Sequence, residues 1–530
     1  MPKITGETQW LVEALAKDYS RLAPPDVPTI KLSQLVSKLG FFYEKLRNAI
    51  DYSDEHLIRH NSLRRFLKRQ VIFLQEKDPK KISQALINEF IRAKYLPNDA
   101  LPETLIDEVG RIIAKYLIIL KQVGKNPPLE PAKIIAWTLD LAMCEIDENL
   151  FPIDKELAIA NYMYAQMTAQ LNFKNAALDG KEKNLQIYLT VLRTLLKADR
   201  PLLKYRLFKL YHPNWPGISL PDILEFYPKM DELNNKIEAH LNFYLGFQIT
   251  QNIRPQSVFF KILRQLIETN QQEIAKILTN EKLLEEKITA ICSANYQRIR
   301  GKLMGSIFRV IIYILFTKTI LAFILELPFD KIFIGTVNWQ ALVINVVFHP
   351  LLMFIIAMSI RIPGRKNTQL IISEIKKIIS GEERKLIFKA RKIMKRGSFS
   401  NLAFNGFYLT LFAISFGLVI LGLNKLHFNL VSGVLFIFFL SVVSFFGFRL
   451  RNFANQYLVL PRKENLFNLL MDILTLPIIR VGQFFSSNFS RINIFLYILD
   501  FIIETPFKLL LEIIEKAVSF IREKREEIVE

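Results

Sequence analysis

The stretch that decides the fold class is Val347–Asn367, which reads VFHPLLMFIIAMSIRIPGRKN. It is apolar for about four helical turns, contains one His-Pro pair, and ends at a run of Arg, Pro, Gly and Lys. Together with the apolar residues that precede it, it reaches the roughly 20 residues that a helix needs to cross a bilayer. The stretch therefore predicts a membrane span with a histidine inside it and a basic flank at its end.

The composition indicates a chain that is partly lipid-embedded and partly soluble. Of 530 residues, 51% are hydrophobic and 42 are Phe, yet 23% are charged and the net charge is +20. Residues 301–530 carry 28 Lys and Arg against 15 Asp and Glu, whereas residues 1–300 carry 42 against 35. Because the positive excess follows the apolar half, we expect a bilayer with anionic headgroups as the electrostatic partner, and no nucleic acid.

Four apolar runs approach the length of a membrane span: residues 307–325, 339–360, 402–423 and 430–448. Residues 361–396, between the second and third runs, hold twelve Lys and Arg against three acidic residues. The loops on the other side, around Lys331 and Lys425, hold one basic residue each. The positive-inside rule then places the basic loop in the cytoplasm, and an even number of spans places both termini there too. The N-terminus has no basic start leading into an apolar run, so no cleavable signal peptide is expected.

The sequence predicts an all-α fold with three regions. Residues 1–300 form a large cytoplasmic helical domain, in which the Pro-rich stretch 211–221 is a candidate subdomain boundary. Residues 301–450 form the membrane domain, with a basic cytoplasmic loop at 361–401. Residues 451–530 form amphipathic helices and a charged tail.

The basic loop reads as two amphipathic helices separated by Gly381. We expect them to lie on an anionic leaflet; the alternative is that they pack on protein and that their charges face solvent. The side chains expected to contact lipid are Arg384, Lys385, Lys389, Arg391, Lys392, Lys395 and Arg396.

The C-terminal region carries a similar pattern. Asp500, Glu504, Lys508 and Glu512 recur every four residues among apolar ones, which is typical of an interfacial helix rather than a span. The preceding helix is expected to kink or end at Pro477. The sequence leaves open whether residues 465–521 lie on the membrane or pack on the helical domain.

No sequence motif indicates an enzyme. Phosphate loops, HExxH and GxSxG motifs and calcium loops are absent, which lowers the expectation of catalysis without excluding it, and no cofactor is expected. Cys144 and Cys292 are far apart in sequence and predict neither a disulfide framework nor a zinc site.

Two charged segments of the helical domain are weaker candidates. His56 and His60 have a spacing that can hold a metal, but a solvated helix face is the simpler interpretation. Next to them lies a basic head cluster that could bind lipid headgroups or an acidic partner: Arg64, Arg65, Lys68 and Arg69. The acidic segment 140–156 reads as a solvated, partner-binding surface.

Three polar side chains are predicted to share one layer inside the membrane. Lys318 lies roughly 10 Å from the outer end of the first span, and Asn345 and His349 lie at similar depth on one face of the second. Ionisable groups at such depth are candidates for ion passage or proton transfer. The alternative is structural: Lys318 reaches the interface or pairs with Glu326, and Asn345 and His349 join helices.

Three function classes follow. The first is a membrane-anchored scaffold or interaction platform that binds a protein partner through its helical domain. The second is a channel or transporter, for which a homo-oligomer is a candidate because four spans enclose little polar pathway. The third, with least support, is a lipid-modifying enzyme.

Overall fold

The computed structural model describes residues 5–32 except 20 and 25, 55–174 except 129, 179–384, 386–389, 398–460, 466–491, and 513, 514, 517, 520 and 521. Over these residues the chain is helical apart from two four-residue strands and one isolated bridge, so the all-α prediction is confirmed. The predicted C-terminal stripe Asp500, Glu504, Lys508 and Glu512 and the tail 522–530 lie outside the described residues, as do Lys385, Arg391, Lys392, Lys395 and Arg396.

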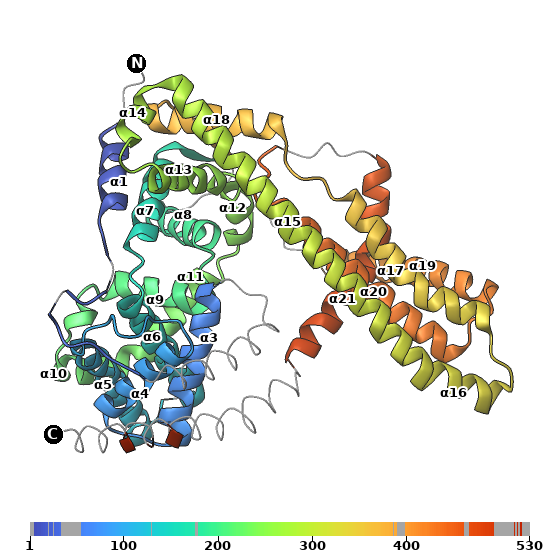
Figure 1. The fold of residues 1–530 in the computed structure, drawn as a ribbon, viewed down its shortest axis with the longest axis horizontal. Coiled ribbons are helices and arrows are strands. Elements are labelled where there is room, and N and C mark those ends of the chain that lie inside the picture. Colours follow the sequence, from blue (N-terminus) through green and yellow to red (C-terminus); the bar gives the residue numbers. More distant parts are fainter. Residues whose placement is uncertain are drawn as a thin grey trace. The chain divides into compact units, whose positions relative to one another are not determined.

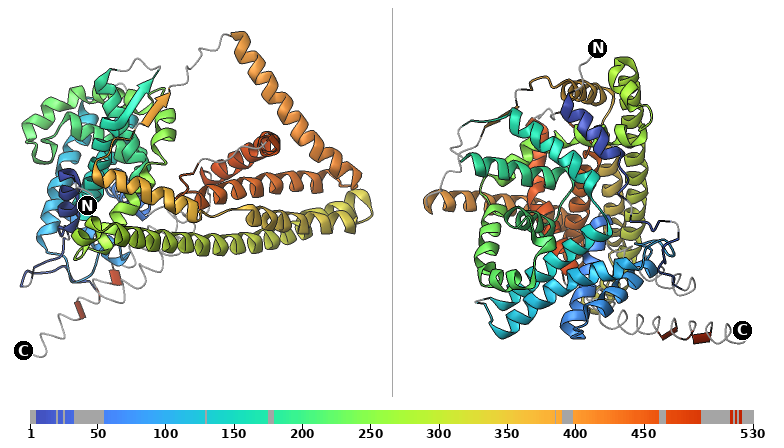
Figure 2. Two further views of the ribbon diagram at one scale, coloured as in Figure 1. Left: turned by 90° about the horizontal axis from the view of Figure 1, so that it is seen from above. Right: turned by 90° about the vertical axis from the view of Figure 1, so that its left-hand side faces the viewer.

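The chain divides into two compact units. The first, called the head here, includes the described residues of Gly6–Ser257 and residues 386–389 (Figures 1 and 2). Its helices are α1 (Gly6–Ala16), α3 (Glu55–Leu67), α4 (Pro79–Arg92), α5 (Thr104–Lys125), α6 (Pro131–Leu150), α7 (Asp154–Gln170), α8 (Gly180–Leu195), α9 (Arg200–Tyr211), α10 (Leu220–Phe226), α11 (Met230–Leu241) and α12 (Gly246–Ile253).

The head packs around a core of aromatic side chains. The Phe208 ring on α9 lies 4.7 Å from the ring of Trp215 and 5.9 Å from that of Trp137 on α6. Trp215 lies within the Pro-rich stretch 211–221 and is 1% exposed. This stretch is therefore anchored in the core, because a buried Trp contributes a large apolar area.

Two short strands, far apart in the sequence, pair within the head. Strand β1 (Leu171–Lys174) pairs in parallel with β2 (Leu386–Lys389), and Phe173 and Phe388 pack with ring centroids 4.8 Å apart. The expectation of a second amphipathic helix is therefore wrong for residues 386–389. A short apolar run such as Leu386–Phe388 fits a strand as well as a helix, and here the strand buries Phe388 completely.

The second unit, called the apolar unit here, comprises Val258–Arg384 and the described part of Arg391–Ile494. Its elements are α13 (Ser257–Thr269), α14 (Ile274–Thr279), α15 (Glu281–Leu321), a π-helical turn η4 (Ala322–Glu326), α16 (Leu327–Phe329), a second π-helical turn η5 (Asp330–Ile334), α17 (Trp339–Ser359), α18 (Arg365–Ser380), α19 (Ser398–Lys425), α20 (Leu430–Ala454) and α21 (Leu466–Arg491).

Helix α15 dominates the apolar unit. Asn280 caps it by accepting a hydrogen bond from the Leu283 backbone, and it runs unbroken for 41 residues, or about 60 Å (Figure 1). That length is about twice the roughly 30 Å thickness of a bilayer core. Its first half is charged and its second half is apolar, so a single continuous helix joins a polar segment to an apolar one.

The amphipathic helix α18 packs on the charged half of α15. Its residues Ile371, Ile375 and Ile378 are fully buried, and Lys376 Nζ lies 2.6 Å from Glu281 Oε1 on α15. Asn367, at the start of α18, donates to the hydroxyl of Tyr296 on α15 at 2.9 Å. The apolar face of α18 is therefore covered by protein, which matches the alternative expected from the sequence.

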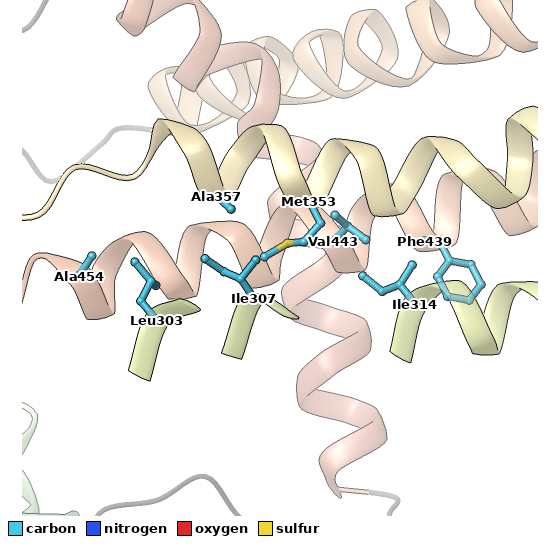
Figure 3. Close-up of a cluster of buried hydrophobic side chains, with 8 residues drawn as sticks. All are labelled: Leu303, Ile307, Ile314, Met353, Ala357, Phe439, Val443 and Ala454. Carbon is cyan, nitrogen blue, oxygen red and sulfur yellow. The ribbon is translucent and has the colours of Figure 1, made fainter. Parts of the chain in front are cut away.

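Helices α15, α17 and α20 run side by side and enclose an apolar cluster between them (Figures 1 and 3). The cluster comprises Leu303, Ile307, Ile314, Met353, Ala357, Phe439, Val443 and Ala454. Gly447 on α20 brings that helix close to α17, since an added Cβ would lie 2.7 Å from Ile356 Cγ2.

Among the described residues, five helical segments are long and apolar enough by length and composition to cross a membrane, one more than the four predicted runs: Glu281–Ile334, Trp339–Ser359, Leu402–Lys425, Leu430–Ala454 and Leu469–Ser487. The fifth lies in α21, where Pro477 stands inside a continuous helix and does not end it. Of the two expectations for Pro477, a kink or a helix end, the helix end is wrong. In Figure 1, α21 crosses α20 instead of running alongside it.

The α20–α21 crossing depends on one small residue. A Cβ added to Gly482 would overlap the carbonyl oxygen of Ser441, so the two backbones are in direct contact. Beside this contact the rings of Phe438 and Phe485 pack 5.0 Å apart, and Ser415 Oγ on α19 donates to Leu474 O at 2.9 Å.

We expect Gly482→Leu to separate α21 from α20, because a leucine side chain has no space at this crossing. The thermal unfolding midpoint of the purified full-length protein in detergent should fall by several degrees. Gly422→Leu on α19 is the matched control, since no atom lies within 4 Å of an added Cβ there. Equal midpoints for the two variants would contradict the close crossing.

Candidate functional site

Three polar side chains of the apolar helices are buried inside the bundle. Lys318 is 2% exposed and Asn345 and His349 are fully buried, while Phe316 on α15 and Met358 on α17 are 66% and 72% exposed. The structure thus brings the three predicted residues together in one layer between α15, α17 and α20. It adds Glu326, which is 1% exposed, and Ser432, which is 3% exposed.

The Asn345 amide bridges a cation and an anion. Lys318 Nζ donates to Asn345 Oδ1 and, at 2.9 Å, to the Asn345 backbone carbonyl. Asn345 Nδ2 donates to Glu326 Oε1 at 2.5 Å. An ammonium can only donate and an ionised carboxylate can only accept, so this arrangement fixes which way the amide faces. The amide therefore transmits the attraction between Lys318 and Glu326.

The far ends of this chain of hydrogen bonds also have partners. Glu326 Oε2 accepts a hydrogen bond from Ser432 Oγ on α20 at 3.0 Å. The Lys318 ammonium lies 4.9 Å from the centre of the Phe439 ring and 5.7 Å from that of Phe436, within the range of cation–π attraction. Three helices and the turn η4 are therefore joined by one network.

His349 links α17 to α20. Its Nδ1 lies 3.2 Å from the Asn345 carbonyl oxygen, one turn earlier, and its Nε2 lies 3.0 Å from the Phe436 carbonyl oxygen. Both neighbours are acceptors, so a neutral imidazole can donate to only one of them at a time, whereas an imidazolium would donate to both. The ring also packs edge-on against Phe436, at 4.7 Å between centroids.

A second polar pair closes the end of the bundle. Asn429 caps α20 by accepting from the Ser432 backbone at 2.7 Å, and its Nδ2 donates to Asp330 Oδ1 at 2.5 Å. Asp330, at the start of η5, is 3% exposed. Ser432, Asn429 and Asp330 were not predicted as site residues, because a Ser in an apolar run or an Asn at a helix start carries no signal of its own.

The basic head cluster meets the acidic segment inside the head. On α3, Arg59 Nε lies 3.1 Å from Asp147 Oδ1 on α6, and Arg64 pairs with Asp140 on the same helix. Arg69 Nη2 lies 2.5 Å from Glu89 Oε2 on α4. Much of the charge expected to face partners is therefore neutralised between helices of the head.

His60 lies between two carboxylates. Its Nε2 is 3.3 Å from Asp147 Oδ2 and its Nδ1 is 3.1 Å from Asp199 Oδ2. Burial alone lowers the pKa of His60, but hydrogen bonds and attraction from Asp147 and Asp199 outweigh burial and raise the pKa to about 9. Both nitrogens thus hold protons that face carboxylates, and the His56 and His60 rings meet edge-on at 5.9 Å.

The remaining predicted lipid contacts are only partly described. Arg384 is 6% exposed, and its Nη1 lies 3.6 Å from Glu374 Oε2 on α18. Lys389 is the last residue of β2. Arg384 is therefore placed as an internal ion pair instead of a headgroup contact.

The head also contains a cavity that the sequence did not indicate. It has a volume of about 920 Å³, and its lining includes the cations Arg111, Lys115 and Lys209 and the anions Glu145, Glu148 and Asp154. Lys115 Nζ donates to Glu145 Oε1 at 2.5 Å and to Trp215 O at 3.2 Å. This ion pair is internally satisfied and fastens the cavity wall to the aromatic core.

No protein-family model, curated protein or solved structure matches the chain.

We expect Asn345→Leu to destabilise the apolar unit by ~2 kcal/mol, because it leaves Lys318 and Glu326 buried without the amide between them. The measurement is the unfolding free energy of the full-length protein in detergent. Gln340→Leu is the control on the same helix, because Gln340 is exposed. Equal stabilities of the two variants would mean that the amide does not join the charges.

We expect His60 to make the stability of the head depend on pH. The folded-state pKa of about 9 lies above the ordinary value of 6.5, so the contribution is complete below pH 6.5 and disappears as the pH rises through 9. The contribution of His60 to the unfolding free energy amounts to ~3 kcal/mol. The difference in unfolding free energy between wild type and His60→Gln should therefore shrink between pH 6.5 and 9. A constant difference across this window would contradict the protonated pair.

Proposed function

We propose that this chain is an integral membrane protein that holds a helical head at the cytoplasmic face of a bilayer. The observation that carries this proposal is the inverted distribution of side chains in the apolar unit. Lys318, Glu326, Asn345 and His349 are buried, whereas no more than 39% of any of the five apolar windows is buried. Water would disfavour so much exposed apolar surface, whereas lipid would favour it.

In the proposed topology α15, α17, α19 and α20 cross the membrane and both termini are cytoplasmic. The basic residues of 361–396 support this orientation, as do Arg298 and Arg300 before the first span and Arg449 and Arg451 after the fourth. Helix α21 is proposed to lie across the bundle, because it meets α20 at a crossing and not along its length.

The proposed role is that of a membrane-anchored interaction platform with a protein partner. The charged half of α15 is about 30 Å long and is braced by α18, so it forms a rigid stalk on the cytoplasmic side. The head offers a 920 Å³ cavity with balanced charges as a candidate docking point. No catalytic arrangement among the described residues competes with this interpretation.

The second candidate is a channel or transporter, and the buried network of Lys318, Asn345 and Glu326 favours it. Charges inside a membrane are candidates for ion or proton movement by default. A homo-oligomer belongs to this proposal, since the layer is enclosed within one chain and leaves little room for a pathway. A lipid-modifying enzyme has the weakest support, because the described residues form no carboxylate or histidine site at the expected interface.

The test uses the full-length protein in sealed liposomes. Single cysteines at Lys331, Arg365 and Ser487, all exposed, are labelled with a membrane-impermeant maleimide; Cys144 and Cys292 are buried. The reagent should reach residue 365 from the side of the membrane opposite to residue 331. It should reach residue 487 from the same side as residue 365. Labelling of residues 331 and 365 from the same side would contradict the membrane topology. Labelling of residues 487 and 331 from the same side would make α21 a fifth span.

The same liposomes separate the two functions. The platform predicts no ion or proton flux above that of empty liposomes. A flux that Glu326→Gln abolishes, while the labelling pattern is unchanged, would favour the channel or transporter.

A further inference from the structure

A short apolar tip protrudes from the head directly after α3. The chain continues from α3 into a π-helical turn, η1 (Lys68–Phe73), none of whose residues is buried. Ile72, Phe73 and Leu74 are 38%, 56% and 57% exposed. Three consecutive large apolar side chains at a helix end are unusual on a soluble surface.

The backbone holds this tip in place. The Leu74 N–H donates to Arg69 O at 2.9 Å, and the Glu76 N–H donates to Gln70 O at 3.0 Å. Gln75 takes a left-handed conformation with φ of 51°, which turns the chain sharply toward α4. Asp78 then caps α4 by accepting from the Lys80 backbone at 2.9 Å. The apolar side chains are thus presented on a closed turn instead of a loose loop.

Positive charge surrounds the tip. Residues 64–81 contain seven Lys and Arg against Glu76 and Asp78. Arg64 and Arg69 pair with carboxylates of the head, but Lys68, Lys77 and Lys81 are exposed. The Lys68 ammonium lies 5.8 Å from the centre of the Phe73 ring, so this cation is next to an exposed aromatic side chain of the tip.

We propose that residues 71–74 insert into the anionic cytoplasmic leaflet and give the head its own contact with the membrane. Apolar side chains that enter the acyl boundary beneath a ring of lysines match the chemistry of an anionic lipid surface. The inference rests on the proposed membrane anchoring, which keeps the head beside a leaflet. It assigns a role to Lys68 and its neighbours that differs from the internal ion pairs of Arg64 and Arg69.

A second exposed aromatic segment of the head provides the control. Tyr244 and Phe247 are 59% and 72% exposed, so they match the tip in exposed apolar character. Residues 241–253, which contain them, hold no Lys or Arg. The proposal therefore expects Phe247 to stay in water.

The test places an environment-sensitive NBD label on Leu74→Cys, or on Phe247→Cys, of the full-length protein in nanodiscs. Nanodiscs of neutral lipid are compared with nanodiscs that contain 30% anionic lipid, as a rough choice of composition. Lipids brominated in the acyl chain should quench the label at residue 74 at least threefold more strongly in anionic than in neutral nanodiscs. Iodide in the water should quench this label less in anionic than in neutral nanodiscs. The label at residue 247 should respond to iodide only.

A charge variant distinguishes insertion from apolar partitioning of the label. Lys68→Glu with Lys77→Glu, in the Leu74→Cys background, should lose most of the quenching by brominated lipid. Iodide quenching at residue 74 equal to that at residue 247 would overturn the proposal. Failure of the protein to incorporate into nanodiscs would instead contradict the membrane anchoring, so the two failures are distinguishable.

Discussion

The apolar unit depends on the amide of Asn345. A lysine and a glutamate on one long helical run cannot both be buried in an apolar bundle unless each has a partner. Asn345 provides both partners from α17, with its oxygen toward Lys318 and its nitrogen toward Glu326. Ser432 then ties the glutamate to α20. The packing of α15, α17 and α20 follows from this network as much as from their apolar cluster, because the network fixes the register in which the helices meet.

The two ends of α15 are held by different forces. In its apolar half the neighbours are isoleucines, a methionine and a phenylalanine, which pack without directional preference. In its charged half Lys376 of α18 meets Glu281 and Glu285, and Asn367 meets Tyr296. Screening by salt weakens the exposed ion pairs but leaves the apolar contacts untouched. The charged half is therefore the part of this unit whose stability depends on ionic strength.

The sequence predicts the members of the buried polar layer where their spacing along the helices determines their depth. Asn345 and His349 are one turn apart, and Lys318 reaches them because antiparallel helices of known rise bring equal depths together. Glu326 was named only as an alternative partner of Lys318, and its burial was not predicted. The π-helical turn η4 accounts for this burial, because a turn with an extra residue rotates the side chains. Such a turn has no signature in composition.

Other features depend on partners distant in the chain. Leu386–Lys389 became a strand because Phe173, more than 200 positions away, offers a ring to Phe388. The histidine and arginines of α3 face Asp140 and Asp147 because α3 packs on α6. Local periodicity cannot show that a basic face and an acidic face will meet, so both were expected to face solvent.

The enclosure of the polar layer bears directly on function. Lys318 Nζ, both ends of the Asn345 amide, both carboxylate oxygens of Glu326 and Ser432 Oγ each have a hydrogen-bond partner within the protein. Moving a proton or ion through this chain therefore requires several hydrogen bonds to break together. A pathway for ions needs sites that bind weakly enough to release. A network this closed is better suited to locking a bundle than to conducting, and a locked bundle at the base of a continuous 41-residue helix holds a stalk rigid. This is the physical reason to favour an anchored platform.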